Sequence, residues 1–194
     1  MEKHTWKLFP TLVHYFKDVL SPEQLATIHR DCLEANVGTH GAFIGKNKSS
    51  FDREARLIED LESRHANLAG LKRGLSALIK DYADELGFEN VKISNSWFNV
   101  QYPGSVLKHH VHPESHVSAA LCIHADEHSS KLFLENPNPV LNLIRPDHYK
   151  ESMFEFIKVA MAPGDLLLFP SWIKHGSGFE ANESEGRVMI SMNA

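Results

Sequence analysis

Three histidines in two separate segments have the residue type and spacing of a metal site. His110 and His112 lie two positions apart in the segment His-Val-His-Pro over 110–113. On an extended strand, residues two apart project to the same face, so both imidazoles can reach one ion. His175 follows an apolar run that stops at Pro170, and such a strand delivers its imidazole to the end of a barrel. We therefore predict that these three histidines bind one metal ion.

One arginine lies shortly beyond the last of these histidines. Arg187 opens the segment RVMISMN, which predicts a final strand. Four residues of this segment share one face: Arg187, Met189, Ser191 and Asn193. A guanidinium binds a carboxylate through two parallel hydrogen bonds, so Arg187 suits a dicarboxylate such as 2-oxoglutarate. The alternative is a surface ion pair with Glu183 or Glu185.

Iron would suit this combination of residues. Three protein ligands on one face of an iron leave three positions open, enough for a bidentate 2-oxo acid and for dioxygen. His109 and His116 are alternative ligands, although His109 points to the opposite face from His110 if the strand is regular. Alternatively, His175 is a buried histidine that forms hydrogen bonds and binds no metal.

Other residues near these motifs have structural interpretations. Asp165 is expected to complete the turn after Gly164 and not to bind metal. Trp172 and Phe169 are expected to lie in the core. Three histidines lie beside charged or turn residues and are expected at the solvated surface: His124, His128 and His148.

The second half of the chain, which carries these candidates, has the period of β-strands. From Val91 onward, apolar residues occur in short runs separated by Pro-Gly, Asn-Pro and Pro-Gly-Asp turn signals. The predicted strands cover 92–102, 116–124, 131–135, 155–160, 165–170, 173–179 and 186–193. Short strands at this density indicate a β-sandwich or barrel, with helices packed on one outer face.

The first half has the period of α-helices. Residues 21–24, Ser-Pro-Glu-Gln, supply an N-cap, a proline and an acidic first turn, which predict a helix over about 22–35. A charged stretch over 53–64 predicts a second helix. Leucines at three- and four-residue steps over 68–86, followed by Gly87, predict a third. We expect a loop over 38–52, which together with the irregular stretch 136–152 lines the entrance to the site.

Composition limits the class of protein. A chain of 194 residues fits one domain with a complete core. No apolar run approaches the roughly 20 residues of a membrane span, and no basic start with an apolar block indicates secretion, so a soluble cytoplasmic protein is expected. The net charge is −5 with no stripe of lysine and arginine, which argues against nucleic acid as a partner. Cys32 and Cys122 lie in apolar stretches and are expected to be reduced core thiols.

Several of these motifs occur together in one known family. They are Leu-Phe-Pro-Thr over 8–11, Asn99 before a Pro-Gly turn, His-Val-His-Pro followed by Ser115 and Ser118, Phe-Pro-Ser-Trp over 169–172 with its histidine, and the segment 187–193. In this combination the sequence resembles the Fe(II)- and 2-oxoglutarate-dependent dioxygenases, and within them a small family of uncharacterised oxygenases from bacteria and phages. The resemblance extends over nearly the whole chain.

The resemblance implies a fold and a set of roles. The fold would be mainly β with N-terminal helices (α+β): a double-stranded β-helix, or jelly roll with a cupin-like barrel. One domain over 1–194 would comprise a mainly helical support region, 1–90, and the β-helix core, 91–194. His110, His112 and His175 would bind Fe(II). The cosubstrate contacts would be Arg187, Asn99, Gln101 and Ser191.

This chain departs from the family pattern at two places. Most relatives have His-x-Asp or His-x-Glu where this chain has His110 and His112, so three neutral imidazoles would hold the iron and the site would carry one more positive charge. The resemblance also implies Gly-Val-Tyr-Tyr after Ser118, and here residues 119–122 are Ala-Ala-Leu-Cys. A tyrosine hydroxyl that would contact the cosubstrate is therefore absent.

The implied activity is hydroxylation of an unactivated C–H bond with dioxygen, releasing succinate and CO2 from 2-oxoglutarate. The substrate would be a small molecule or an amino-acid or peptidyl side chain. The basic residues of the two entrance segments, Lys46, Lys48, Arg145 and His148, suggest a mildly polar or anionic substrate.

Three alternatives use the same residues. A cupin-type enzyme would bind metal through three histidines and act without 2-oxoglutarate. A non-catalytic β-barrel module would bind metal without turnover. Zinc or nickel would replace iron, since imidazole suits several metals.

Overall fold

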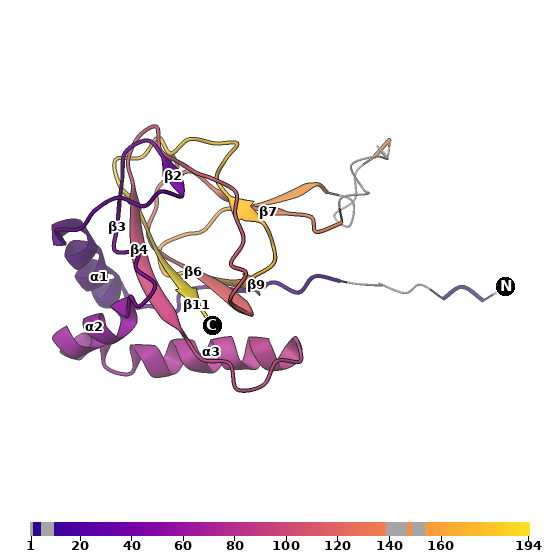
Figure 1. Ribbon diagram of the computed structural model, residues 1–194, viewed down its shortest axis with the longest axis horizontal. Coiled ribbons are helices and arrows are strands. Elements are labelled where there is room, and N and C mark those ends of the chain that lie inside the picture. The colour runs from indigo at the N-terminus through magenta and orange to yellow at the C-terminus, as the bar shows by residue number, and fades with distance from the viewer. Residues whose placement is uncertain (1, 5–9, 139–146, 149–153) are drawn as a thin grey trace.

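The largest sheet of the computed structural model (Figure 1) joins strands from both halves of the chain. The structure describes residues 2–4, 10–138, 147–148 and 154–194. Six strands pair in the order β1-β9-β6-β11-β4-β3. Their bounds are β1 His14–Phe16, β9 Leu166–Pro170, β6 Val117–His124, β11 Arg187–Asn193, β4 Asn95–Gln101 and β3 Asn47–Ser49.

Two smaller sheets complete the β structure. One has the order β10-β7-β8, and the other pairs β2 with β5. Their bounds are β10 His175–Gly176, β7 Leu132–Glu135, β8 Phe156–Val159, β2 Phe43–Ile44 and β5 Val106–Leu107. Every pair of these named strands is antiparallel. The fold is therefore mainly β and antiparallel.

The helices lie along one side of the large sheet, away from β7 (Figure 1). They are α1 Pro22–Glu34, α2 Leu57–Arg64, the 3-10 turn η1 Ala66–Leu68 and α3 Leu71–Glu85. A capping box between Ser21 and Gln24 starts α1, with Pro22 in its first turn. Leu75, Ile79 and Tyr82 recur on one buried face of α3, which packs against the sheet. Within the described residues, no helix is long and apolar enough to cross a membrane.

The alternation of side chains along each strand divides the molecule into a helix-covered core and a cavity. On β11, Val188 and Ile190 belong to the core under the helices, whereas Arg187 and Ser191 line a cavity on the opposite face. On β4, Phe98 and Val100 pack into that core, and Trp97, Asn99 and Gln101 line the cavity. A second, smaller cluster packs between β9 and β7: Leu132, Leu134, Leu167, Phe169 and Ile173. The same strands thus supply stability on one face and the site on the other.

Six of the seven strands predicted in the second half are confirmed with small changes at their ends. The strand predicted over 173–179 is wrong in part, because only His175–Gly176 forms β10, and the two-residue β5 was not predicted. The helices predicted at 22–35 and 68–86 are also confirmed, and the one predicted at 53–64 begins only at Leu57. The loop predicted over 38–52 is wrong in part, because β2 and β3 form there. β1 was not predicted, and its three residues pair with β9, so tertiary pairing overrides the weak local signal. Most of 136–152, and Leu8 and Phe9, lie outside the described residues.

Both cysteines are free and buried, as predicted. Burial raises the pKa of the Cys32 thiol to about 12 and that of the Cys122 thiol to about 11. Neither thiol is therefore ionised near neutral pH, which fits a structural role.

Gly176 in β10 is required by a close approach of two backbones. A Cβ atom there would lie 2.5 Å from Cδ2 of His109 and 2.8 Å from the carbonyl oxygen of Leu107. We predict that Gly176→Ala lowers the free energy of unfolding by about 2 kcal/mol, because backbone must move to relieve the clash. Gly186→Ala is the control, since nothing lies within 4 Å of its Cβ position. Equal urea midpoints for the two variants would show that the approach is not tight.

Candidate metal centre

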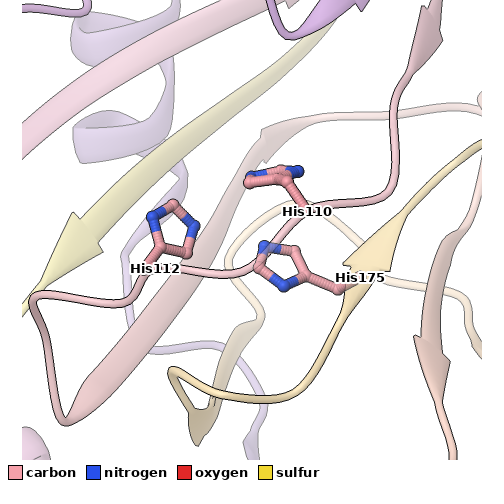
Figure 2. A group of neighbouring side chains, drawn as sticks. All are labelled: His110, His112 and His175. Carbon is pink, nitrogen blue, oxygen red and sulfur yellow. The ribbon is translucent and has the colours of Figure 1, made fainter.

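Three imidazoles converge in the cavity. The rings of His110 and His112 come from one chain segment and that of His175 from another, and all three face one another (Figure 2). Ring centroids are 4.4 Å apart for His110 and His175, 4.9 Å for His110 and His112, and 5.2 Å for His112 and His175. One ligand nitrogen from each ring lies within 4.8 Å of the others. Among the described residues this is the only cluster of three or more His, Cys, Asp or Glu with this geometry.

Backbone hydrogen bonds join the two segments. The N–H of His110 donates to the carbonyl oxygen of His175 at 2.9 Å, and the N–H of His175 donates back at 3.0 Å. The N–H of His112 donates to the carbonyl oxygen of Ser171 at 3.0 Å. The two rings were expected to share a face as they would on an extended strand, but only an isolated bridge between His110 and His175 forms there. Pairing with 171–175, and not strand geometry, brings both rings to one side.

Two of the rings are oriented by backbone carbonyls. Nδ1 of His110 lies 2.8 Å from the carbonyl oxygen of Lys108, and Nδ1 of His175 lies 2.9 Å from that of Ile173. A carbonyl only accepts, so Nδ1 carries the proton in both rings and Nε2 keeps its lone pair. Histidine ligands of metals commonly show this arrangement, in which the outer hydrogen bond sets the tautomer.

The environment holds all three imidazoles neutral. Burial, and then the proximity of His110, lowers the pKa of His175 to about 3. Burial followed by the charges of His110 and His40 lowers the pKa of His112 to about 4. Burial also lowers the pKa of His110. Because a metal binds the unprotonated ring, the cluster is ready to bind one near neutral pH.

The alternative ligands lie outside the cluster. Nδ1 of His109 contacts the carboxylate of Glu135 in a very short hydrogen bond. His116 stacks on Phe88 with ring centroids 4.4 Å apart. His128 and His148 are exposed, as predicted, but His124 is half-buried and stacks on His29.

The remaining predicted site residues line the same cavity as the three histidines. β4 and β11 are paired so that Arg187 lies opposite Gln101, Met189 opposite Asn99 and Ser191 opposite Trp97. Asn99 Nδ2 lies 3.4 Å from the Ser191 hydroxyl, and its Oδ1 accepts a 2.7 Å hydrogen bond from Ser49. Asn99, Gln101, Ser191 and Arg187 all belong to the cavity wall.

Arg187 is a buried cation without an anionic partner. Only 6% of its surface is exposed, and burial lowers the pKa of its guanidinium. Nη1 donates to Oε1 of Gln101, while no Asp or Glu among the described residues forms an ion pair with it. The alternative of a surface ion pair with Glu183 or Glu185 is therefore wrong. A buried charge in this state is costly, and an anion entering the cavity would relieve that cost.

Sequence reasoning assigned no role to Trp97 or His40, which line the cavity, and it placed Asn193 on the same face as Arg187 without giving it a role. Trp97 lies two positions from Asn99 on β4, so period-two alternation could have identified it. The indole Nε1 of Trp97, Nε2 of Gln101 and Oδ1 of Asn193 are buried without a hydrogen-bond partner. A polar ligand in the cavity would satisfy such atoms. No local signal in the sequence identified His40.

Three further predictions near the site have clear outcomes. Asp165 does complete its turn, since Oδ2 accepts from the Ala162 N–H at 2.7 Å and from the Tyr15 hydroxyl. Phe169 is in the core, with its ring centroid 4.7 Å from that of His175. Trp172 was expected in the core but is 52% exposed. Ser171 takes the inward position there and hydrogen-bonds Ser118, which leaves its neighbour outside.

Comparison with known proteins gives a family and a fold. The model of a family described as "Putative 2OG-Fe(II) oxygenase" matches residues 95–193, slightly more than half of the chain. No curated protein matches the sequence.

Solved structures with the same fold include three enzymes with low sequence identity. A Pseudomonas putida prolyl-4-hydroxylase has a TM-score of 0.64 and 13% identity, over 94% of this chain and 92% of that one. A 2OG-Fe(II) family oxidoreductase from Burkholderia pseudomallei has a TM-score of 0.62 and 13% identity, over 93% and 82%. HygX from Streptomyces hygroscopicus, with nickel, 2-oxoglutarate and hygromycin B bound, has a TM-score of 0.63 and 11% identity, over 94% and 82%.

Removing any one imidazole should weaken metal binding. We predict that His110→Ala, His112→Ala and His175→Ala each lower the affinity for Fe(II) by about 100-fold or more, because each removes one of three ligands. Anaerobic competition with a chromophoric chelator measures the change. His116→Ala is the matched control, and its affinity should equal that of the wild type. A single-histidine variant with wild-type affinity would remove that residue from the ligand set.

The low pKa values predict how the stability of the metal-free protein depends on pH. His175 is neutral when folded down to a pKa of about 3, whereas an unfolded histidine takes up a proton near pH 6.5. The unfolded state then binds more protons below that pH, so stability is present above pH 6.5 and falls as the pH falls. Between pH 7 and pH 5 we expect this histidine to account for a loss of about 1–2 kcal/mol.

Urea unfolding in the presence of a chelator tests this expectation. His175→Gln should lose less stability than the wild type between pH 7 and pH 5, by about that amount. Parallel losses in the two proteins would contradict the assignment of a lowered pKa to His175.

Proposed function

The chain belongs to the 2OG-Fe(II) oxygenase family, whose model spans strands β4 to β11, and from this membership we propose a role for each residue of the cavity. The protein is a 2OG-Fe(II) oxygenase, with Fe(II) as its metal and 2-oxoglutarate and O2 as cosubstrates. We propose that His110, His112 and His175 hold the iron, and that Arg187 anchors 2-oxoglutarate. The buried, unpaired Arg187 in the same cavity as three neutral imidazoles carries this proposal.

The residues present fit the two groups. Three imidazoles with free Nε2 lone pairs suit Fe(II), although imidazole also accepts zinc and nickel. The Arg187 guanidinium supplies the positive charge and the forked donors that the distal carboxylate of 2-oxoglutarate needs. Gln101 orients that guanidinium through Oε1, and its unpartnered Nε2 offers a further donor.

The other cavity residues would orient the cosubstrate and shield the reacting groups from water. We propose Asn99 and Ser191 as cosubstrate contacts. The Asn99 amide donates to the Ser191 hydroxyl and accepts from Ser49, which fixes its orientation. Trp97 offers its buried indole N–H as a donor. The resemblance implies a tyrosine hydroxyl as a donor from a different strand, after Ser118, and that hydroxyl is absent here. Phe169 and Leu132 close the cavity with apolar surface, which excludes water from the reacting groups.

We propose that the fold is a double-stranded β-helix. The large sheet and the β10-β7-β8 sheet enclose the cavity between them, since residues of β11 and β4 line it together with Leu132 of β7 and His175 of β10. We further propose one oxygenase domain over 1–194 whose core is 91–194. From the first ninety residues, β1 and β3 contribute to the large sheet beside the helices.

The reaction that this site supports is hydroxylation. When bound, iron with 2-oxoglutarate and dioxygen would supply the oxidant for this reaction. One oxygen atom of dioxygen would enter the C–H bond of the substrate, and the other would enter succinate as CO2 leaves. The protein's own residues bind, orient and exclude water, and no acid–base side chain is required. We propose a small molecule or an amino-acid side chain as the substrate.

A spectroscopic titration tests the two binding roles together. Under anaerobic conditions, Fe(II) and 2-oxoglutarate should give the weak visible charge-transfer band near about 500 nm that such a chelate produces. Arg187→Met should raise the 2-oxoglutarate concentration at half-saturation by about 30-fold or more, because it removes the only arginine or lysine among the described residues of the cavity wall.

Two controls separate binding from folding. Arg73→Met alters an exposed arginine on α3 and should leave the titration unchanged. The metal-free Arg187→Met protein should be at least as stable as the wild type, since a buried unpaired cation is replaced by an apolar group. An iron-loaded wild type without the band would refute the cosubstrate assignment, and consumption of oxygen without succinate would favour the cupin-type alternative.

A further inference from the structure

A fourth histidine lines the cavity from the first half of the chain. The His40 side chain is half-buried in the cavity wall, and its ring lies against Phe51 with centroids 4.3 Å apart. Its backbone N–H donates to Oδ1 of Asn47 at 2.8 Å, which fixes the loop. None of the hydrogen bonds described for the protein involves the ring nitrogens of His40, so they are available to a ligand. His40 is outside the three-histidine cluster, yet close enough to interact electrostatically with His110 and His112.

Lys108, which does not itself line the cavity, brings a positive charge close to His40. Its backbone N–H donates to the carbonyl oxygen of Ala42 at 2.9 Å, which holds it beside the His40 loop. Its charge acts on His40, and it is exposed and has no ion pair within the described part of the chain. The two lysines expected at the entrance are engaged elsewhere: Lys46 lies over the Tyr102 ring and Lys48 donates to the carbonyl oxygen of Leu33.

The charges in the cavity do not cancel when its proposed ligands are bound. No Asp or Glu belongs to the described cavity wall, and His112 stands where relatives place a carboxylate. The two positive charges of Fe(II) and the one of Arg187 exceed the two negative charges of 2-oxoglutarate by one. A net charge in a partly buried site is costly unless another anion compensates it.

We propose that the substrate is an anion, held beside the metal centre by His40 and Lys108. This inference rests on the proposed function and adds the substrate class. The His40 ring would donate a hydrogen bond to a carboxylate or similar group, and Lys108 would supply the opposite charge. The uncompensated charge of the three-imidazole centre favours the same sign of ligand.

Binding of matched acid and amide probes tests the charge preference. The probes are N-acetyl amino acids and their C-terminal carboxamides, which differ in charge and little in shape. The protein is loaded with Zn(II) and saturating 2-oxoglutarate, and binding is followed by ligand-observed NMR. We expect at least one acid to bind about tenfold more tightly than its amide, without displacing 2-oxoglutarate. Equal binding of acids and amides, no binding of any acid, or binding only by displacement would each overturn the proposal.

Variants assign the preference to its residues. His40→Gln and Lys108→Met should each reduce the preference for the acid several-fold, while Lys46→Met, which removes a lysine that lies over Tyr102, should retain it. Zn(II) affinity should be unchanged in His40→Gln, and a tenfold loss would make His40 a metal ligand and refute its substrate role. A preference that survives both variants would also refute the assignment.

Binding of 2-oxoglutarate distinguishes a failure of the proposed function from a failure of the anionic-substrate proposal. If the wild type does not bind 2-oxoglutarate in the presence of metal, the proposed function fails. If it binds 2-oxoglutarate but does not distinguish acid from amide, only the anionic substrate is refuted.

Discussion

Reciprocal backbone hydrogen bonds between His110 and His175 hold the site together. They join an irregular segment to a two-residue strand, and neither would keep its shape alone. Carbonyl oxygens of the same two segments then orient both rings. The position of the two rings therefore depends on main-chain pairing. The close packing of Gly176 against 107–109 shows how little space this pairing leaves.

The second constraint is electrostatic. The cavity wall contains Arg187 and four histidines, and none of its described residues is acidic. The net charge of the chain is −5, yet none of its described carboxylates lines the cavity that holds Arg187. Burial keeps the imidazoles neutral but cannot remove the charge of arginine. His112 stands where the family resemblance implies a carboxylate, and this departure underlies the proposed anionic substrate.

Stability and function use opposite faces of the same strands. On β11 and β4, alternate residues pack under the helices while their neighbours line the cavity. Packing on one face fixes the register, because a slip by one residue would exchange the two sets. The helices therefore position Arg187 and Asn99 without touching the site. This arrangement allows the cavity residues to vary while the core is retained.

Periodicity and turn signals in the sequence were sufficient to predict α1, α3 and the longer strands of the second half, because these elements have strong local patterns. The two-residue strands β5 and β10 are too short to have such a pattern. Residue type and spacing were also sufficient to single out the three histidines and Arg187, which the structure brings to one cavity. Only the tertiary structure placed β1 and β3 at the edges of the sheet and brought His40 into the wall of the cavity that holds the three histidines. Those placements depend on pairing between distant segments, whose free energy comes from contacts that no local pattern records.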